Sequence, residues 1–341
     1  MIRISSRFLY FFVPIITFGF NLSVGQTHLP QPNIEKSIEK LVEQGYLGQA
    51  QFFKDVELAW PDALPILIKN IEHPDENIRE MIVKSLRFNR APCSEVGESI
   101  GKRLGDQIQK VRYESVYSLS DLNCKSQVEE IKNLIKSEKD LEVLNIAIPS
   151  LGKLGTSTDI SFLKDIEQDE LRLLGTRLQA TYALAKLNGP YDSQLIKTGL
   201  TTDNDEIKTT SLRALGKTGN LDLYKSLETD IQHLKTENKF LKEATYAEKA
   251  VVLYARNQSV TQQEYYLFSL LDDKEAMVRQ WAALKVAEEF ADPKNVEKLA
   301  DIASTPSKRG SEEAFFILLY KKLKTQEELF NLMSKKQSSP K

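Results

Sequence analysis

The sequence of 341 residues has few of the residue types that form metal and catalytic sites. It contains two cysteines and three histidines, His28, His73 and His233. No histidine pair has the spacing of metal ligands on a helix, and the cysteines do not form a CxxC motif. A Ser/His/Asp constellation is also lacking. We therefore predict that the protein is not an enzyme and has neither a metal nor a cofactor.

An excess of positive charge is lacking as well. The chain has 46 lysines and arginines against 48 aspartates and glutamates, a formal net charge of −2. Proteins that bind nucleic acid need a basic surface to contact phosphates. The charge balance therefore argues against a nucleic-acid partner.

Long apolar segments are scarce, and the N-terminal one, Phe8–Phe20, is shorter than the about 20 residues that span a bilayer. Arg3 and Arg7 precede it, and the small residues Ser23 and Gly25 follow. This order is typical of a secretory signal peptide. We predict cleavage near Gly25, a periplasmic or secreted protein, and no membrane span after cleavage. An uncleaved membrane anchor is the alternative.

The stretch Ile207–Asn220, IKTTSLRALGKTGN, is the unit that the chain repeats. With Ile207 at position zero, apolar or small residues follow at +4, +7 and +8, on one face of a helix. Gly219 at +12 is expected to end the helix in a left-handed conformation, and Asn204 to cap its start.

The same frame recurs at spacings of 31 to 36 residues. Its zero positions are Ile78, Val111, Val143, Thr176, Ile207, Glu243, Val278 and Ser311. Position +12 carries residues that tolerate positive φ in four consecutive units, namely Asn123, Gly155, Asn188 and Gly219. We predict an all-α array of about eight helix pairs.

The array defines the organisation of the chain. We assign residues 1–25 to the signal peptide, 26–33 to a linker, 34–60 to N-terminal capping helices and 61–334 to the repeat array. Residues 335–341 form a polar tail, which we expect to be disordered. The long spacing around residues 228–242 predicts an extended helix or an insertion.

The pattern D-x-x-[VI]-R-x-x-[AS]-x-x-[AS]-L-x-x-L-G is best matched by Asp75–Leu86, Val111–Leu122, Leu151–Gly155, Leu215–Gly219 and Val278–Val286. It resembles the short bacterial HEAT-like repeat, a type also found in phycobilin-lyase-related proteins. The resemblance implies a right-handed α-solenoid that serves as a binding scaffold. The basic residue at +1 is present as Arg79, Arg112, Arg177, Lys208 and Arg279. Leu144 replaces it in the unit anchored at Val143, and the unit at Glu243 is degenerate.

One motif looks like a nucleotide site. Gly216-Lys217-Thr218 resembles the end of a phosphate-binding loop, but Ser211 stands where that loop needs its first glycine. The same slot reads Gly152-Lys153-Leu154 two repeats earlier. We therefore interpret the motif as a repeat signature.

Aromatic residues occupy positions +2, +3 and +6, which should face away from the interior. A tyrosine hydroxyl tolerates a wet surface, and in related solenoids this helix lines the concave side. We predict a partner-binding surface; packing between repeats is the alternative. Its residues are Tyr113, Tyr117, Tyr182, Tyr246 and Trp281, with Arg213 as a polar contact.

The two cysteines, Cys93 and Cys124, lie at +15 and +13 of adjacent units. Stacking should bring them to similar heights on one side, and export would permit oxidation. A disulfide is predicted as possible, with buried free thiols as the alternative.

These observations favour a non-catalytic, monomeric, exported scaffold that binds a protein or peptide partner on the concave face. The alternative is an enzyme or cofactor-handling protein of the phycobilin-lyase-related HEAT type. That reading requires ionisable residues from several repeats to meet in a cleft.

Overall fold

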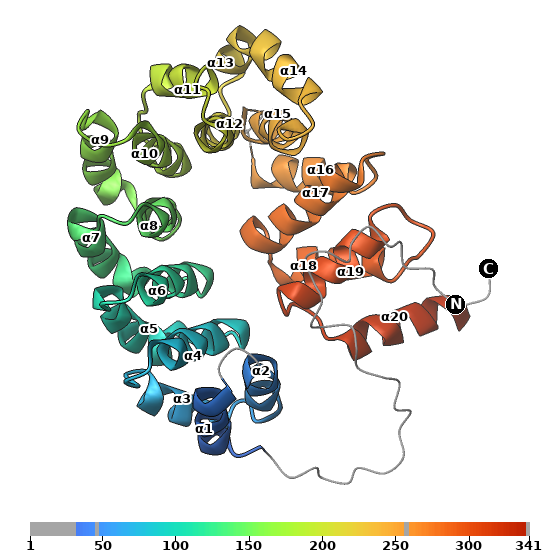
Figure 1. Cartoon of the computed structure of the whole chain (residues 1–341). Helices are drawn as coiled ribbons and strands as arrows, with labels where there is room; N and C mark the ends of the chain where they lie inside the picture. Colours follow the sequence, from blue (N-terminus) through green and yellow to red (C-terminus); the bar gives the residue numbers. More distant parts are fainter. Residues whose placement is uncertain (1–31, 45–47, 256–258, 339–341) are drawn as a thin grey trace. The chain divides into compact units, whose positions relative to one another are not determined.

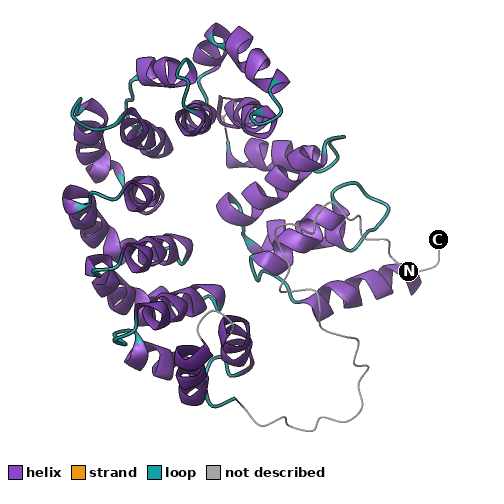
Figure 2. Ribbon diagram, in the orientation of Figure 1, coloured by secondary structure: helices purple, strands orange, loops and turns teal. Residues whose placement is uncertain are grey.

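The computed structural model describes residues 32–44, 48–255 and 259–338, where every regular element is a helix (Figures 1 and 2). This part contains twenty α-helices and no strand. The all-α prediction is confirmed. No helix among the described residues is both long enough and apolar enough to cross a bilayer. The predicted signal peptide and most of the predicted linker lie outside the described residues.

The chain divides into two compact units, one ending at Glu130 and the other beginning at Ile131. Unit 1 contains α1 (Ile34–Gln44), α2 (Gln49–Leu58), α3 (Ala63–Asn70), α4 (Glu76–Phe88), α5 (Cys93–Lys102) and α6 (Gln109–Asp121). Helices α1 and α2 occupy the predicted capping segment and pack on each other. Helix α3 pairs with α4 and α5 pairs with α6, while α4 also packs directly on α6.

Unit 2 repeats this pairing over more helices. They are α7 (Val128–Ser137, which starts just before the division), α8 (Leu141–Leu154), α9 (Ile160–Gln168), α10 (Leu174–Lys186), α11 (Ser193–Leu200), α12 (Asp205–Thr218), α13 (Leu221–Ser226), α14 (Glu228–Thr236), α15 (Leu241–Ala255), α16 (Val260–Leu270), α17 (Ala276–Glu289), α18 (Pro293–Ala303), α19 (Ser311–Tyr320) and α20 (Gln326–Ser338). Helices α8, α10, α12, α15, α17 and α19 pack in that order, each on the next. We call them the anchor row (Figure 1).

The segment before Glu243 and the C-terminal tail were both expected to be irregular, and the structure describes helices in each. An extra helix accounts for the long spacing before the unit at Glu243, because both α13 and α14 stand between α12 and α15. The insertion is therefore confirmed. The expected disordered tail is wrong for residues 335–338, because α20 continues to Ser338. Residues 339–341 lie outside the described part.

Helix ends follow the local signals in most units. The Asn204 side chain accepts hydrogen bonds from the amides of Glu206 and Ile207, as its role as N-cap predicts. Left-handed ends occur at Gly219, Asn123 and Asn188, with φ of 60°, 58° and 57°.

Gly155 differs from these helix ends, and its predicted left-handed conformation is wrong. Its φ and ψ are −73° and −178°, because the chain leaves α8 in an extended conformation and enters the capping box of Thr156 and Asp159 at once. A glycine is still needed, because an added Cβ would lie 2.6 Å from the carbonyl oxygen of Leu151.

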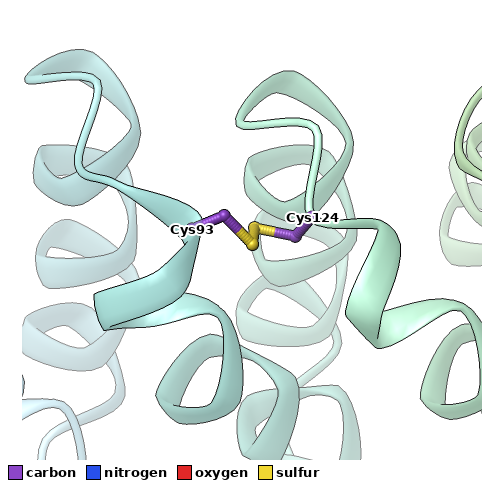
Figure 3. The surroundings of a disulfide bond; sticks show 2 residues. All are labelled: Cys93 and Cys124. Carbon is purple, nitrogen blue, oxygen red and sulfur yellow. A yellow bond between two sulfur atoms is a disulfide. The ribbon is translucent and has the colours of Figure 1, made fainter.

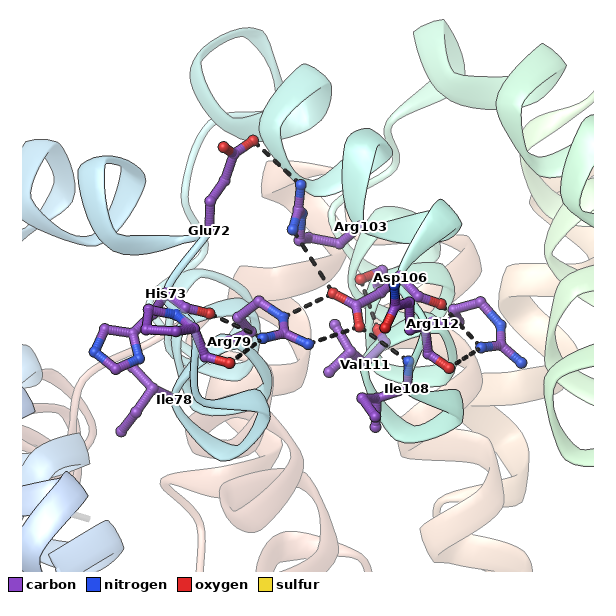
Figure 4. Close-up of polar contacts among 12 residues, drawn as sticks. Glu72, His73, Ile78, Arg79, Arg103, Asp106, Ile108, Val111 and Arg112 are labelled. Carbon is purple, nitrogen blue, oxygen red and sulfur yellow. Dashed lines mark hydrogen bonds and ion pairs between the residues drawn. The ribbon is translucent and has the colours of Figure 1, made fainter.

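The basic residue at +1 holds the repeat turns together. The Arg79 guanidinium donates to the carbonyls of His73 and Pro74, and to both carboxylate oxygens of Asp106 at 2.7 and 2.9 Å (Figure 4). Burial would raise the pKa of Asp106, but the bonds from Arg79 outweigh it and lower that pKa. Arg279 repeats the arrangement in unit 2 with its own turn and Glu313.

A shallow hollow of about 420 Å³ lies over this turn in unit 1. His73, Arg79 and Asp106 line it, but these polar groups bond to one another or to nearby backbone. His73 Nδ1 accepts a hydrogen bond from the amide of Asp75. We assign the hollow to the repeat turn.

Close approach of neighbouring helices defines the anchor row. A Cβ added to Gly152 on α8 would lie 2.6 Å from the Cα of Ala183 on α10. On α12, a Cβ added to Gly216 would lie 3.1 Å from the Cα of Ala247 on α15. Further along both helices, Gly219 meets Tyr254, so α12 and α15 run parallel. The glycines of the Gly-Lys signature are therefore packing residues.

We predict that Gly152→Ala destabilises the protein by about 1–3 kcal/mol, because the new methyl group meets backbone atoms that must shift. This exceeds the gain of roughly 0.5–1 kcal/mol that alanine brings to a helix. Gly105→Ala is the control, since nothing lies within 4 Å of its added Cβ. Urea unfolding measures both changes, and equal stabilities for the two variants would contradict the packing argument.

A disulfide joins Cys93 and Cys124 in unit 1 (Figure 3). Cys93 begins α5 and Cys124 follows α6, with Cα atoms 5.4 Å apart. Packed helix axes are about 8–10 Å apart. The bridge forms because Cys124 lies in the connection after its helix, where the chain comes closer. Gly97 packs on the bridge, since an added Cβ would lie 2.9 Å from the Cys93 sulfur.

Removing this bridge should lower the free energy of unfolding. The disulfide closes a separation of 31 residues, so the double variant Cys93→Ser/Cys124→Ser is expected to lose about 3–4 kcal/mol. Reductant should destabilise the wild type by a similar amount and leave the double variant unchanged. Equal unfolding of the wild type with and without reductant would contradict the prediction.

Candidate functional site

Ionisable side chains gather at the C-terminal ends of anchor-row helices in unit 2. Lys186 is the last residue of α10, Lys217 lies in the last turn of α12, and Glu289 is the last residue of α17. The helices pack in register, so corresponding positions of successive repeats come together. We call the following side chains the lysine cluster: Tyr182, Lys186, Lys217, Tyr254, Lys285 and Glu289.

The Glu289 carboxylate is the acidic centre of the lysine cluster. It accepts a hydrogen bond from the Tyr254 hydroxyl at 2.9 Å and lies 3.0 Å from Lys285 Nζ and 3.6 Å from Lys217 Nζ. Its side chain is 22% exposed. Burial alone would raise the pKa of Glu289, but the two lysines and the hydrogen bonds lower it to about 2. Glu289 therefore remains charged at neutral pH.

Two opposing effects set the pKa of Lys217. Its side chain is 13% exposed, and its ammonium lies 3.7 Å from the ring centroid of Tyr254. Burial lowers the pKa of Lys217 to about 8, although the charge of Glu289 acts in the opposite direction. Lys285 has the closer bond to Glu289, and that bond raises the pKa of Lys285 despite its burial.

Lys186 is the least compensated member of the cluster. Among the described residues, its ammonium has neither an ion pair nor a hydrogen bond, and only the longer-range charge of Glu289 favours protonation. Burial, followed by repulsion from Lys217, Lys285 and Lys153, lowers the pKa of Lys186 to about 8. A half-buried ammonium without a partner can bind an anion.

One of the predicted partner-binding residues, Tyr182, belongs to this cluster, and another, Arg213, lies near Tyr182. Tyr182 is half-buried and Arg213 is exposed. Burial raises the pKa of Tyr182, and the charges of Lys285, Glu289 and Arg213 act on its hydroxyl. The structure thus brings Arg213 close enough to Tyr182 for its charge to act on the hydroxyl.

Trp281 does not occupy the solvent-facing position that its place in the repeat predicted. It is 6% exposed and stacks on Tyr246, with ring centroids 6.1 Å apart. Its indole packs in the hydrophobic cluster that includes Leu253 and Leu267. The expectation of exposure is wrong for Trp281, because α15 lies close enough for Tyr246 to cover it. Tyr246 itself is half-buried.

The remaining predicted residues belong to unit 1. Tyr113 is 36% exposed, whereas Tyr117 is half-buried with the Arg87 guanidinium 4.4 Å from its ring centroid. Arg87 forms a buried ion pair with Glu114 at 2.9 Å. Tyr117 therefore packs against a structural ion pair, and binding of a partner by Tyr113 and Tyr117 stays a prediction.

The lysine cluster was not predicted from the sequence, although a signal was present. Lys153, Lys186 and Lys217 occupy position +10 of three successive units. Two of them belong to the Gly-Lys signature, which the sequence identified only as a repeat feature. Lys217 lies beside Glu289 of α17, and no local pattern indicates that this helix comes close.

No protein-family model matches this sequence, and no curated protein is significantly similar to it. Within the described residues, no group of three or more His, Cys, Asp or Glu side chains could hold a metal ion.

We predict that two amines of the lysine cluster lose their protons at a lower pH than ordinary lysines. In competitive labelling with trace acetic anhydride, reactivity of Lys186 and Lys217 should rise with a midpoint near the pKa of about 8. Lys239 is the control, because its bonds to Asp205 raise its pKa from the usual 10.5. Glu289→Gln should move the Lys217 midpoint lower, since the carboxylate stabilises the ammonium. Peptide mass spectrometry reports each midpoint; titration of Lys186 together with Lys239 would contradict the prediction.

Proposed function

We propose that the protein is an exported, non-catalytic scaffold built as a HEAT-like α-solenoid, and that it binds an acidic peptide segment of a protein partner. Three features support a repeat scaffold: the in-register anchor row, the recurring arginine clamp at +1, and the glycines between parallel helices. The Cys93–Cys124 disulfide suits an oxidising compartment outside the cytoplasm.

The charge of the lysine cluster indicates the kind of partner. In this half-buried cluster, positive charge exceeds negative charge. Lys186, Lys217 and Lys285 share one carboxylate, Glu289, because the neighbouring Glu288 pairs with Lys321 at 2.9 Å. Charge complementarity therefore favours an acidic ligand. Tyr182 within the cluster and the exposed Arg213 near it supply an aromatic and a polar contact.

The spacing of the helices indicates how such a segment would lie. Neighbouring packed helices are about 8–10 Å apart, and an extended peptide advances about 3.3 Å per residue. A peptide crossing the anchor row therefore meets the next helix at roughly every third residue. Acidic side chains at that interval would face successive lysines on α10 and α12.

The test uses a fluorescent, C-terminally amidated peptide of four Glu-Leu-Ser repeats and a matched Gln-Leu-Ser peptide. Anisotropy with the purified protein should give at least about tenfold tighter binding of the glutamate peptide at low salt, and added salt should reduce the difference. Tyr182→Ala should weaken binding about tenfold, as loss of an interface anchor does.

Tyr265→Ala is the matched control for tyrosine removal. Tyr265 lies on α16, is 76% exposed and is outside the cluster, so binding should not change. Tyr182→Phe keeps the packing and checks that a loss in Tyr182→Ala is not caused by unfolding, which circular dichroism also monitors. Equal affinities for the two peptides, or wild-type affinity in folded Tyr182→Ala, would overturn the proposed function.

A second candidate is an enzyme or cofactor-handling protein, and one observation favours it. Ionisable groups from α10, α12, α15 and α17 meet in a single cluster, and Lys186 and Lys217 have pKa values of about 8. A neutral lysine amine can form a Schiff base with a carbonyl compound. Borohydride trapping of such an adduct on Lys186 or Lys217, with catalytic turnover, would select this candidate over the scaffold.

A further inference from the structure

We infer that Lys186 and Lys217 together form a receptor for one carboxylate group, and that the two lysines take up protons when this carboxylate binds. The inference deepens the proposed function, on which it rests, because it assigns the acidic group of the bound segment to two residues. It also makes recognition dependent on pH.

Geometry supplies the first argument. Lys186 has a half-buried ammonium without an ion pair or hydrogen bond among the described residues. Lys217 Nζ lies 3.6 Å from the Glu289 carboxylate, farther than Lys285 Nζ, which lies 3.0 Å from it. Both lysines end neighbouring anchor-row helices, and each lies in the electrostatic field of Glu289. An added carboxylate would supply the hydrogen-bond acceptor that Lys186 lacks, and a closer one than Glu289 offers to Lys217.

Charge around the pair supplies the second argument. The titratable groups whose charges act on the two lysines or on neighbouring members of the cluster lie on α8, α10, α12, α15 and α17 and just after α19, and most are cationic or neutral. They are Lys153 on α8, Tyr182 on α10, Arg213 on α12, Tyr254 on α15, Lys285, Glu288 and Glu289 on α17, and Lys321 after α19. Lys285 holds Glu289 more closely, and Lys321 holds Glu288. The local excess of positive charge therefore remains on Lys186 and Lys217.

The direction of the pH dependence follows from the titration of the free protein. With pKa values of about 8, each lysine is mostly charged at pH 7 and mostly neutral at pH 9.5. A bound carboxylate stabilises the ammonium form and raises both pKa values, so protons are taken up near pH 8. Affinity should fall about thirtyfold between pH 7 and 9.5 for each lysine that must be charged. An ordinary surface lysine would change affinity hardly at all over this range.

A carboxylate can come from a side chain, from a chain end or from a small free acid, so three probes are needed. The first is the amidated Glu-Leu-Ser peptide, whose carboxylates are side chains. The second is the Gln-Leu-Ser peptide with a free C-terminus, and the third is succinate. Calorimetry at pH 7 and 9.5 gives the affinity, and calorimetry at pH 8 in buffers of different ionisation enthalpy gives the number of protons taken up.

The variants separate this receptor from general electrostatic attraction. Lys186→Met and Lys217→Met should each weaken the strongest-binding probe about tenfold or more at pH 7. Lys294→Met removes the same charge from an exposed position on α18 and should leave affinity within about twofold. Lys186→Arg keeps the charge at all pH values, so it should retain binding at pH 7 and reduce the loss at pH 9.5. Circular dichroism and thermal unfolding establish that each variant is folded.

Proton uptake at pH 8 with selective loss in the two methionine variants would support the receptor. Glutamate-peptide binding with the same affinity in Lys186→Met, Lys217→Met and Lys294→Met, and at both pH values, would overturn the receptor and leave the scaffold proposal standing. Binding of succinate alone, with no peptide bound, would support the carboxylate receptor and overturn the peptide scaffold. No binding of any probe would overturn both.

Discussion

The close approach of parallel helices in the anchor row is the constraint on which the rest of unit 2 depends. Gly152 and Gly216 stand where an added Cβ would meet the backbone of the next helix. Because neighbouring helices touch at these points and run in the same direction, equal repeat positions lie side by side. Helices α10 and α12 pack on each other in the same row, so packing brings their C-terminal lysines near one another, without a direct attraction between them.

The packing that forms the lysine cluster also destabilises the charged forms of its lysines. Burial of Lys186 and Lys217 disfavours their charged forms, so at neutral pH both ammonium groups are less stable in the folded protein than in water. Glu289 offsets part of this cost, and its own lowered pKa stabilises the fold above the usual carboxyl range. Perturbed lysines that keep a residual positive charge are a common property of functional sites. A purely structural role would be served equally by apolar residues at these positions.

The repeat period was sufficient to predict the helices, because it reflects contacts within one unit and between neighbours. Asn204 and Gly219 define the ends of α12 as their residue types require. The left-handed conformation predicted for Gly155 was wrong, because the Thr156 capping box imposes an extended conformation at the same place. Trp281 was mispredicted for a related reason: position +3 is exposed on an isolated helix, but Tyr246 from the preceding unit covers it. The lysine cluster depends on contacts between units several repeats apart, which a local pattern cannot contain.

A crystal structure of the protein soaked with 4-bromobenzoate would test the central claim most directly, because bromine marks the position of the carboxylate ligand by anomalous scattering. The account predicts an anomalous peak in unit 2, with the ligand carboxylate within about 3 Å of both Lys186 Nζ and Lys217 Nζ. It also predicts Glu289 still bonded to Tyr254 and Lys285. A structure in which Lys186 pairs with a carboxylate of the protein itself, with the ligand elsewhere or absent, would contradict it.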